Sequence, residues 1–429
     1  MATRVAFYTF GCRLNQAETA VMEQGFSPGE FEIVDFRDRP DLLVVNTCTV
    51  TENGDADTRR LVNRARRVNP DVRIALVGCQ AQVQKERLLE LPNVRWVIGN
   101  AEKMDTARLI SHSHGSEPEV IAPTIRKEPF TVPFVGLDRH HTRANLKIQD
   151  GCDFFCSFCE IPYARGRARS REFDDILAEA RALAAAGHRE QVLTGINIGT
   201  YDEGGRTIVD VLDALDAVPG LERIRISSIE PTTIDTRVIE RMAAGGKLCR
   251  HLHIPLQAGS DAVLERMLRK YDVAEFHDFV MMVHDAVPGV CLGTDVIVGF
   301  PGESDAAFEE TWRLLLEMPF AYIHVFSYSQ RDHARTRRFD DALNVPRAVI
   351  AERSRRLREL SQRKRRIYNE CFLGREERVL FESQRDGWWN GLTDTYIRVR
   401  VRSDDDLKNR MLPVLLERTD GQAVVGTLA

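Results

Sequence analysis

The chain has 429 residues, of which 43% are hydrophobic and 29% are charged, and its formal net charge is −5. This length allows two or three domains with a large buried core, and the net charge excludes a uniformly basic coat for nucleic acid but leaves room for a local basic patch. Because the sequence has no apolar run long enough to cross a membrane and no apolar signal stretch behind a basic start, we expect a cytoplasmic protein with no membrane partner, whose nine cysteines are reduced and available to bind metal.

The first part of the chain, residues 1–112, predicts a doubly wound α/β domain. Its apolar runs at 5–10, 41–47 and 73–78 indicate buried parallel strands, and a helical pattern follows each run. Residues 113–142 are rich in proline, histidine, glycine and charge, so we expect a linker or hairpin there.

One cysteine comes directly after each of these strands, namely Cys12, Cys48 and Cys79. The carboxyl ends of parallel strands share one edge of a sheet, where ligands bind, so the three cysteines are predicted to converge. Three thiolates suit an iron–sulfur cluster with one incompletely ligated iron, or a zinc ion with a fourth ligand. No histidine follows these strands in the same way, which makes zinc the weaker choice. The alternative is three small side chains that fill tight turns.

Residues 143–366 return to alternating strands and helices. Six apolar runs, each with a helical pattern between it and the next, predict a partial (β/α)6 barrel; they begin at residues 144, 191, 223, 251, 291 and 322. The basic run 352–366 at the end of this region is either a solvated, charged helix or a helix that faces nucleic acid.

A compact cysteine loop follows the first strand of this second region. Cys152, Cys156 and Cys159 have the spacing C-x3-C-x2-C, which lets one loop bind three corners of a cubane and leaves the fourth iron open to an exogenous ligand. A zinc knuckle would show two paired clusters or histidines. We therefore predict an iron–sulfur cluster here rather than structural cysteines.

The last part, residues 367–429, changes character. Short strand patterns separated by glycine and aspartate turns predict a small all-β barrel. Trp388 and Trp389 lie near several arginines, a combination that offers both stacking and charge to RNA. The alternative is that the tryptophans cover the inside of the barrel.

The cysteine loop, with Phe158 before its last cysteine, resembles the signature of the radical S-adenosylmethionine (SAM) superfamily. A three-cysteine α/β domain before this loop resembles the methylthiotransferase family. The resemblance extends over essentially the whole chain, through TFGCRLNQAET, VVNTCTVT, GCDFFCSFCEIPYARGRARSR, LTGINIGTY, ISSIEP, HIPLQAGSD, MLRKY, GTDVIVGFPGE and HVFSYSQR. It implies two 4Fe–4S clusters, an auxiliary one on the first three cysteines and a radical SAM cluster on the loop, with SAM used both as methyl donor and as radical source.

The resemblance also implies further site residues, most of them at the ends of consecutive barrel strands. Those expected to bind SAM are Phe158, Thr194, Gly195, Asn197, Ser228, Glu230, Gln257 and Val298, the last of which precedes the tight turn 299–303. Strand-end capping is the alternative for Ser228 and Glu230. Those expected to bind substrate or RNA are Arg165, Arg167, Arg171, Trp388 and Tyr396. The loop after Arg331 departs from the family pattern, since Asp332 and His333 follow it.

The C-terminal segment resembles a TRAM domain, which implies RNA binding, and C-R-L-N-Q-A-E-T at the first cysteine resembles the branch that acts on tRNA. That branch converts N6-threonylcarbamoyladenosine beside the anticodon to its 2-methylthio derivative. The implied partners are the tRNA anticodon stem-loop, an electron donor such as flavodoxin or ferredoxin, and a sulfur donor. Alternative substrates are isopentenyladenosine in tRNA and a ribosomal-protein aspartate, and a metal-stabilised RNA-binding protein without catalysis is the non-enzyme alternative.

Overall fold

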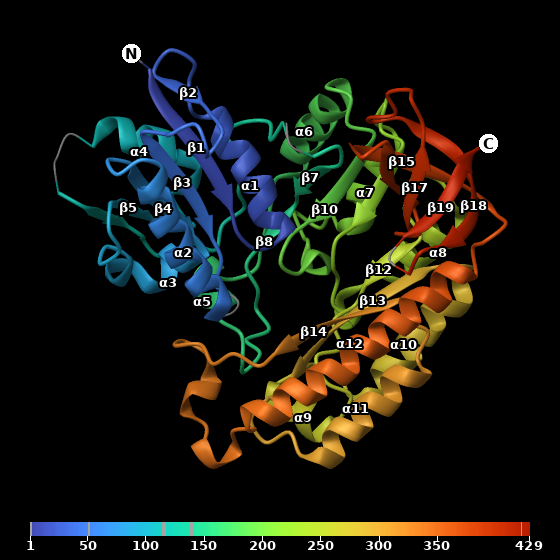
Figure 1. Ribbon diagram of the computed structural model, residues 1–429. Helices are drawn as coiled ribbons and strands as arrows, with labels where there is room; N and C mark the ends of the chain where they lie inside the picture. Colours follow the sequence, from blue (N-terminus) through green and yellow to red (C-terminus); the bar gives the residue numbers. More distant parts are fainter. Residues whose placement is uncertain (1, 50–51, 114–116, 138–140, 422) are drawn as a thin grey trace.

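The computed structural model describes residues 2–49, 52–113, 117–137, 141–421 and 423–429, and its elements fall into three sheet systems in chain order (Figure 1). Val50 and Thr51 of the VVNTCTVT motif, and parts of the predicted linker, lie outside the described residues. No helix in the part of the chain that the structure describes is long and apolar enough to span a membrane.

The N-terminal sheet is parallel throughout, as predicted, and its six strands follow the order β2-β1-β3-β4-β5-β6. The strands are β1 (Thr3–Thr9), β2 (Phe31–Ile33), β3 (Leu42–Thr47), β4 (Arg73–Gly78), β5 (Val94–Ile98) and β6 (Glu119–Ile121). Helices α1 (Arg13–Gln24) and α4 (Thr106–His112) pack on one face, while α2 (Glu52–Val68) and α3 (Cys79–Gln84) pack on the other. Strand β6 lies within the predicted linker 113–142, which therefore contributes an edge strand to this sheet.

The central region contains the six parallel strands predicted for the partial barrel. They are β7 (Ala144–Lys147), β10 (Glu190–Thr194), β11 (Arg223–Ile226), β12 (His251–His253), β13 (Cys291–Val298) and β14 (Tyr322–Ser327). Helices α6 (Phe173–Ala185), α7 (Ile208–Asp216), α8 (Thr236–Ala244), α9 (Asp261–Met267), α10 (Val273–Ala286) and α11 (Asp305–Glu317) lie between them in the chain. Apolar residues of these helices and strands form the largest hydrophobic core of the molecule.

Short elements complete the region around the cysteine loop and the turns. The helix α5 (Ile161–Arg165) follows the loop, and β8 (Gln149–Asp150) pairs antiparallel with β9 (Arg169–Ser170) on either side of it. Single 3-10 turns are η1 (Lys85–Leu88), η2 (Lys103–Asp105), η3 (Ile198–Thr200), η4 (Pro231–Thr233), η5 (Arg335–Arg338) and η6 (Asp341–Leu343).

The C-terminal strands close into the small barrel that the sequence predicts. They are β15 (Glu376–Arg385), β16 (Trp388–Leu392), β17 (Arg398–Arg402), β18 (Met411–Thr419) and β19 (Val424–Leu428), in the order β15-β16-β17-β19-β18. This barrel is docked on the central region, because the Arg225 guanidinium donates to the carbonyl oxygens of Thr393 and Asp394 at 3.0 and 2.9 Å, and Arg250 pairs with the Asp394 carboxylate at 2.7 Å.

A long helix, α12 (Arg347–Glu370), carries the basic run 352–366 and leads into the barrel. Part of its charge is used in packing: Arg353 pairs with Glu303 at 2.8 Å, Arg356 pairs with Glu309 at 2.5 Å, and the Lys364 ammonium donates to the Met318 carbonyl at 2.7 Å. These cations hold α12 to its neighbours, so the packed side of the helix is not a nucleic-acid face.

Candidate active site

The first three cysteines lie at one edge of the N-terminal sheet. Cys12 is the residue before α1, Cys48 follows β3, and Cys79 opens α3 directly after β4. Gly11 has a φ of +91°, and a Cβ built on it would lie 2.9 Å from the Cys48 sulfur, so a side chain at position 11 would displace that cysteine. The glycine therefore lets two of the cysteine segments approach closely.

Side-chain amides and one arginine connect these strand ends. Asn15 donates to the carbonyl oxygens of Phe10 and Thr47 at 2.8 and 3.0 Å. Arg165 donates from Nε to the Cys79 sulfur at 3.2 Å, and Asn100 donates to the same sulfur at 3.5 Å. The Cys79 sulfur thus lies in a site with hydrogen-bond donors, which suits a thiolate ligand.

A buried group of charged side chains surrounds Arg165. The Glu18 carboxylate, 0% exposed, accepts from Lys147 at 2.7 Å, from Arg165 at 2.9 and 3.0 Å, and from Lys103. Asp150 is the second buried carboxylate and pairs with Lys147, Arg165 and Arg169. We call these six residues the charge cluster. Its four cations exceed its two carboxylates, which leaves net positive charge beside the Cys79 sulfur.

The predicted RNA contacts of Arg165 and Arg171 are wrong, because the structure buries both residues. Arg165 was expected to bind substrate or RNA, but the residue is fully buried and both carboxylates of the cluster occupy its guanidinium. Arg171 is likewise fully buried against Asp175 and Glu179. A buried, paired arginine cannot contact a phosphate, so neither of these two residues belongs to an RNA surface. Arg167 is exposed, and its guanidinium lies 4.5 Å from the Phe155 ring centre.

The second set of cysteines lies in the loop between β8 and α5. Gly151 has a φ of +72°, and a Cβ there would lie 2.0 Å from the Arg167 carbonyl oxygen, so only glycine fits before Cys152. The Cys159 amide donates to the Cys156 carbonyl at 3.0 Å, which turns the loop back on itself. Arg269 lies in the MLRKY motif but was not predicted as a site residue; it donates to the Cys156 sulfur at 3.3 Å and pairs with Glu230.

The surroundings of the three thiols in this loop disfavour the thiolate form unless a cation is bound. Burial is the main reason that the pKa of Cys152 is raised to about 11; the Phe154 amide opposes this shift and the neighbouring Cys156 adds to it. Burial also raises the pKa of Cys159, with Cys156 as the next cause. Because burial raises the pKa of all three thiols, they release their protons when a metal centre supplies the compensating charge.

The spacing of the sulfurs distinguishes a cluster from a single ion. Three thiolates on one zinc ion, each about 2.3 Å from the metal, are about 3.8 Å apart. Among the described residues, neither cysteine set has all its sulfurs within 4.8 Å of one another. In each set at least one pair of sulfurs is therefore more than 4.8 Å apart, farther than on a single zinc ion, and three thiols are also the donor set of a cubane with one open iron.

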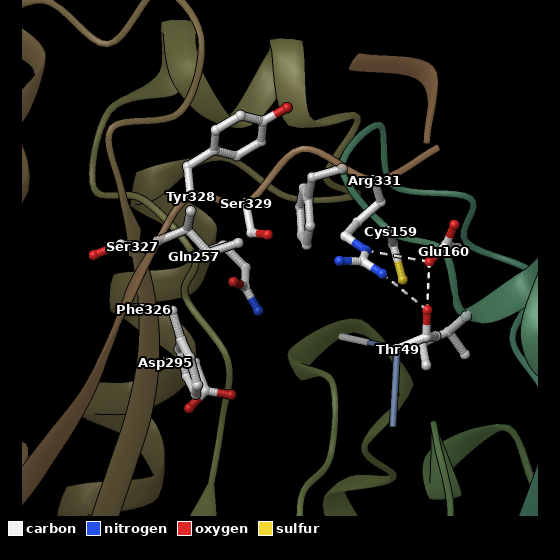
Figure 2. Close-up of a pocket in the computed structure, with 13 residues that line it drawn as sticks. Thr49, Cys159, Glu160, Gln257, Asp295, Phe326, Ser327, Tyr328, Ser329 and Arg331 are labelled. Carbon is white, nitrogen blue, oxygen red and sulfur yellow. Dashed lines mark hydrogen bonds and ion pairs between the residues drawn. The ribbon is translucent and has the colours of Figure 1, made fainter. Parts of the chain in front are cut away.

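A cavity of about 180 Å³ lies beside Cys159 and is lined by residues from several segments (Figure 2). Thr49 comes from the segment after β3, Phe158–Ile161 from the cysteine loop and α5, and Gln257 from the segment after β12. The rest of the wall comes from β13, from β14 and from the residues after it: Asp295, Ile297, Phe326, Ser327, Tyr328, Ser329 and Arg331. The cavity thus touches the residue that follows Cys48 and also Cys159 itself.

The predicted SAM residues divide into two groups. Phe158 and Gln257 line the cavity, whereas Glu230 does not line it and pairs with Arg269, which contacts the Cys156 sulfur. Val298 does not line it: this residue is 1% exposed within the hydrophobic core, and its neighbour Ile297, which alternates to the other side of β13, lies on the wall instead.

The other four predicted SAM residues lie at the ends of β10 and β11. Thr194 and Asn197 are 1% exposed, and the Asn197 side-chain oxygen accepts from Thr233 at 3.0 Å. Gly195 lies close to Gln149, since a Cβ there would be 3.0 Å from its backbone oxygen. Ser228 follows β11 and is half-buried. None of the four lines the cavity.

A second polar group continues the cavity wall along β12, β13 and β14. His253 and His324 lie 2.9 and 3.3 Å from the same oxygen of Asp295. Burial alone would raise the pKa of Asp295, but the two imidazoles hold it well below its usual range. The carboxylate therefore stays ionised on the wall of the cavity.

The two predicted RNA residues of the small barrel have different environments. Trp388 is half-buried, and the guanidinium groups of Arg400 and Arg402 each lie 5.0 Å from its ring centre. Tyr396 points into the molecule: its hydroxyl accepts from Arg13 at 3.4 Å, and its ring lies 4.5 Å from that of His251. Tyr396 is therefore a junction between the barrel and the other regions rather than part of an open RNA surface. Trp389 is buried in the barrel core, which was the alternative considered.

Two family descriptions match the chain. The radical SAM superfamily matches residues 146–315, which include the second cysteine set and most of the barrel strands. The uncharacterized protein family UPF0004 matches residues 4–99, which include the first cysteine set.

The chain is also similar to curated proteins over nearly its full length. It is 38% identical to a Bacillus subtilis protein named threonylcarbamoyladenosine tRNA methylthiotransferase MtaB, over 96% of this chain and 93% of that protein. A protein of the same name from Aquifex aeolicus is 36% identical, over 92% and 96%. A protein from Anaeromyxobacter dehalogenans named tRNA-2-methylthio-N(6)-dimethylallyladenosine synthase is 35% identical, over 99% and 94%.

Among solved structures, the radical SAM methyltransferase TsrM from Kitasatospora setae, with tryptophan substrate and a SAM analog bound, matches with a TM-score of 0.54. The match covers 76% of this chain and 73% of that one at 15% sequence identity. At this identity the likeness concerns the fold alone.

Proposed function

This chain belongs to the radical SAM methylthiotransferases that modify tRNA, and on that premise we propose that it converts N6-threonylcarbamoyladenosine next to the anticodon to its 2-methylthio derivative. The observation that carries the proposal is the cavity between Thr49, which follows Cys48 of the first cysteine set, and Cys159 of the second. The full-length similarity to proteins named for this substrate supports the choice of nucleoside.

Enzymes of this family use SAM and 4Fe–4S clusters, and we assign one cluster to each cysteine set. Cys12, Cys48 and Cys79 would hold the auxiliary cluster, and Cys152, Cys156 and Cys159 would hold the radical SAM cluster. When bound, these groups supply a radical that removes a hydrogen atom and the sulfur that replaces it, with SAM as the methyl donor. The protein supplies orientation and exclusion of water.

The residues of the cavity wall have distinct tasks in this proposal. Phe158 and Ile297 offer apolar surface that shields the reacting atoms from water. Gln257 has a φ of +70° and pairs through its backbone with Asp295 and Ile297, which fixes its side chain at the rim. Arg269 holds Glu230 beside the Cys156 sulfur, so this carboxylate is placed to accept from the hydroxyl or amino groups of SAM. Thr194, Gly195, Asn197 and Ser228 stay predictions as SAM residues.

The tRNA would reach the enzyme through the small barrel. Trp388 with Arg400 and Arg402 forms a stacked aromatic and cationic surface, and Arg385 and Arg398 border a depression on the same barrel. Since the net charge is −5, attraction for the RNA backbone has to come from such a local surface. An electron donor such as flavodoxin or ferredoxin, a sulfur donor and a cytoplasmic location complete the proposal as predictions.

Mass spectrometry of nucleosides tests the assignment. We expect tRNA from cells that lack this protein to lose 2-methylthio-N6-threonylcarbamoyladenosine and retain N6-threonylcarbamoyladenosine. Loss of the methylthio group from dimethylallyladenosine instead would favour the second candidate, which the Anaeromyxobacter relative supports by name. The purified, reconstituted enzyme should add the group to tRNA that carries only the precursor. A tRNA pool unchanged in both nucleosides would overturn the proposal.

A further inference from the structure

Three buried residues connect the segments that follow the two cysteine sets. Thr49 comes directly after Cys48, and Glu160 comes directly after Cys159. The Thr49 hydroxyl donates to a Glu160 carboxylate oxygen at 2.7 Å (Figure 2). These residues belong to different sheet systems and are 111 positions apart, so the hydrogen bond joins the N-terminal sheet to the cysteine loop.

Arg331 completes the connection from a third segment, the chain after β14. Its Nε lies 3.3 Å from the same oxygen of Glu160, and one terminal nitrogen lies 3.2 Å from the Thr49 hydroxyl. That terminal nitrogen also donates to Asp55 at 3.0 Å. Arg331 was singled out in the sequence because the residues after it depart from the family pattern, and the structure explains what the arginine itself contacts.

Burial makes this arrangement specific. Thr49 is 0% exposed, Glu160 4% and Arg331 6%, so their polar groups bond to one another and to nearby protein groups, Asp55 and the His333 amide, rather than to bulk water. A hydrogen bond between charged groups shielded from water is stronger and more directional than one at the surface. We call Thr49, Glu160 and Arg331 the bridge. All three also line the cavity, so the bridge forms part of its wall.

We propose that the bridge is a positioning device that sets the separation and orientation of the two cysteine sites. Adjacent Cα atoms are only about 3.8 Å apart, so fixing Thr49 against Glu160 fixes Cys48 relative to Cys159. The inference rests on the proposed function, in which a sulfur-bearing group at one site reaches a carbon activated at the other. Displacement of reacting groups by about 1 Å is enough to slow a reaction about 100-fold.

The inference predicts that loss of the bridge affects methylthio transfer but not cluster assembly, whereas a general loss of stability would reduce both. Each cysteine set is complete without the bridge, since none of the three residues is a cysteine. A variant that lacks the bridge should therefore still assemble both clusters, while the amount of methylthio group transferred per SAM cleaved decreases. The magnetic interaction between the two reduced clusters should weaken or change, because it depends steeply on their separation.

The test compares Thr49→Val with Thr49→Ser in the full-length, reconstituted protein. Valine keeps the size of threonine and removes the hydroxyl, whereas serine retains the hydroxyl. We expect Thr49→Val to bind as much iron as wild type, to lose the wild-type cluster–cluster interaction in electron paramagnetic resonance spectra, and to form about ten to one hundred times less methylthio product per 5′-deoxyadenosine. Thr49→Ser should restore both readouts toward wild type.

A second variant, Arg331→Met, keeps the proposal testable if Thr49→Val does not fold. It removes the cation that contacts both other members and should give the same two changes. Wild-type spectra and wild-type product ratios in both variants would overturn the inference. The spectroscopic result does not require product, so it still tests the bridge if wild type proves to act on another substrate and the proposed nucleoside is wrong.

Discussion

Replacing Glu18 by glutamine should destabilise the contact between α1 and the central region. The Glu18 carboxylate is 0% exposed and accepts from Lys103, Lys147 and Arg165. Glutamine has the same shape but only one oxygen, and its amide hydrogens would face a cation. Breaking a buried ion pair on one side costs about 3–5 kcal/mol, because the remaining charge is left without compensation.

Amide hydrogen exchange of α1 is the appropriate assay, because a protein with several domains need not unfold in one step. A loss of about 3–5 kcal/mol corresponds to exchange that is faster by about two to nearly four orders of magnitude. The matched control is Asp57→Asn, which removes an exposed carboxylate paired with Arg60, where we expect a change of about 0–1 kcal/mol.

The stabilising contribution of Glu18 should also depend on pH. The cations of the charge cluster, Arg165 before the others, hold the pKa of Glu18 well below its usual value of 4.5 although burial opposes them. The stability that Glu18 contributes is therefore complete above pH 4.5 and decreases as the pH falls toward the folded-state pKa. Glu18→Gln should lack this part of the acid dependence. Exchange in α1 that matches wild type at neutral pH would refute the reasoning about the charge cluster.

Three further predictions concern the cysteines, the small barrel and Lys103. Cys156→Ala should abolish SAM cleavage and leave the auxiliary cluster assembled, whereas Cys48→Ala should retain SAM cleavage and stop methylthio transfer. Iron content and product analysis measure both effects. Full product from Cys48→Ala would contradict the assignment of the first cysteine set. Trp388→Ala should weaken tRNA binding by about 1–3 kcal/mol, the usual value of a stacked base, without changing SAM cleavage, and unchanged affinity in a filter-binding assay would remove this residue from the RNA surface. Burial lowers the pKa of Lys103 from 10.5 to about 8, so the unfolded chain binds more protons between these values and stability should rise with pH across that window. Urea unfolding should show this slope in wild type and not in Lys103→Met, and equal slopes would contradict the prediction.

The sequence pattern predicted the fold correctly where a strand is recognisable from its own run of apolar residues. The buried runs at 42–47 and 73–78 became β3 and β4, and the cysteines after them lie at one sheet edge as predicted. The parallel arrangement forces strand ends together regardless of the sequence between them, so this convergence is predictable from local patterns.

Other site features depend on contacts between distant segments, which no local pattern records. Arg165 and Arg171 lie in a segment rich in arginine, which is typical of an RNA-binding loop. In the folded protein they are buried and paired with carboxylates from other elements. Val298 was predicted to bind SAM, but its neighbour Ile297 lines the cavity; alternate residues of a strand face opposite sides, and the sequence does not tell which side faces the cavity. The bridge joins residues 49, 160 and 331, whose pairing only the fold determines.

The contact between Arg13 and Tyr396 has a consequence for biosynthesis. These residues are 383 positions apart, yet Arg13 follows Cys12 directly and uses the Tyr396 hydroxyl as a hydrogen-bond partner. Domains generally form in the order in which they leave the ribosome, starting from the N-terminus. The sheet edge that carries Cys12 therefore emerges long before Tyr396, so the Arg13–Tyr396 contact forms only after the small barrel has been synthesised and has docked on the earlier domains.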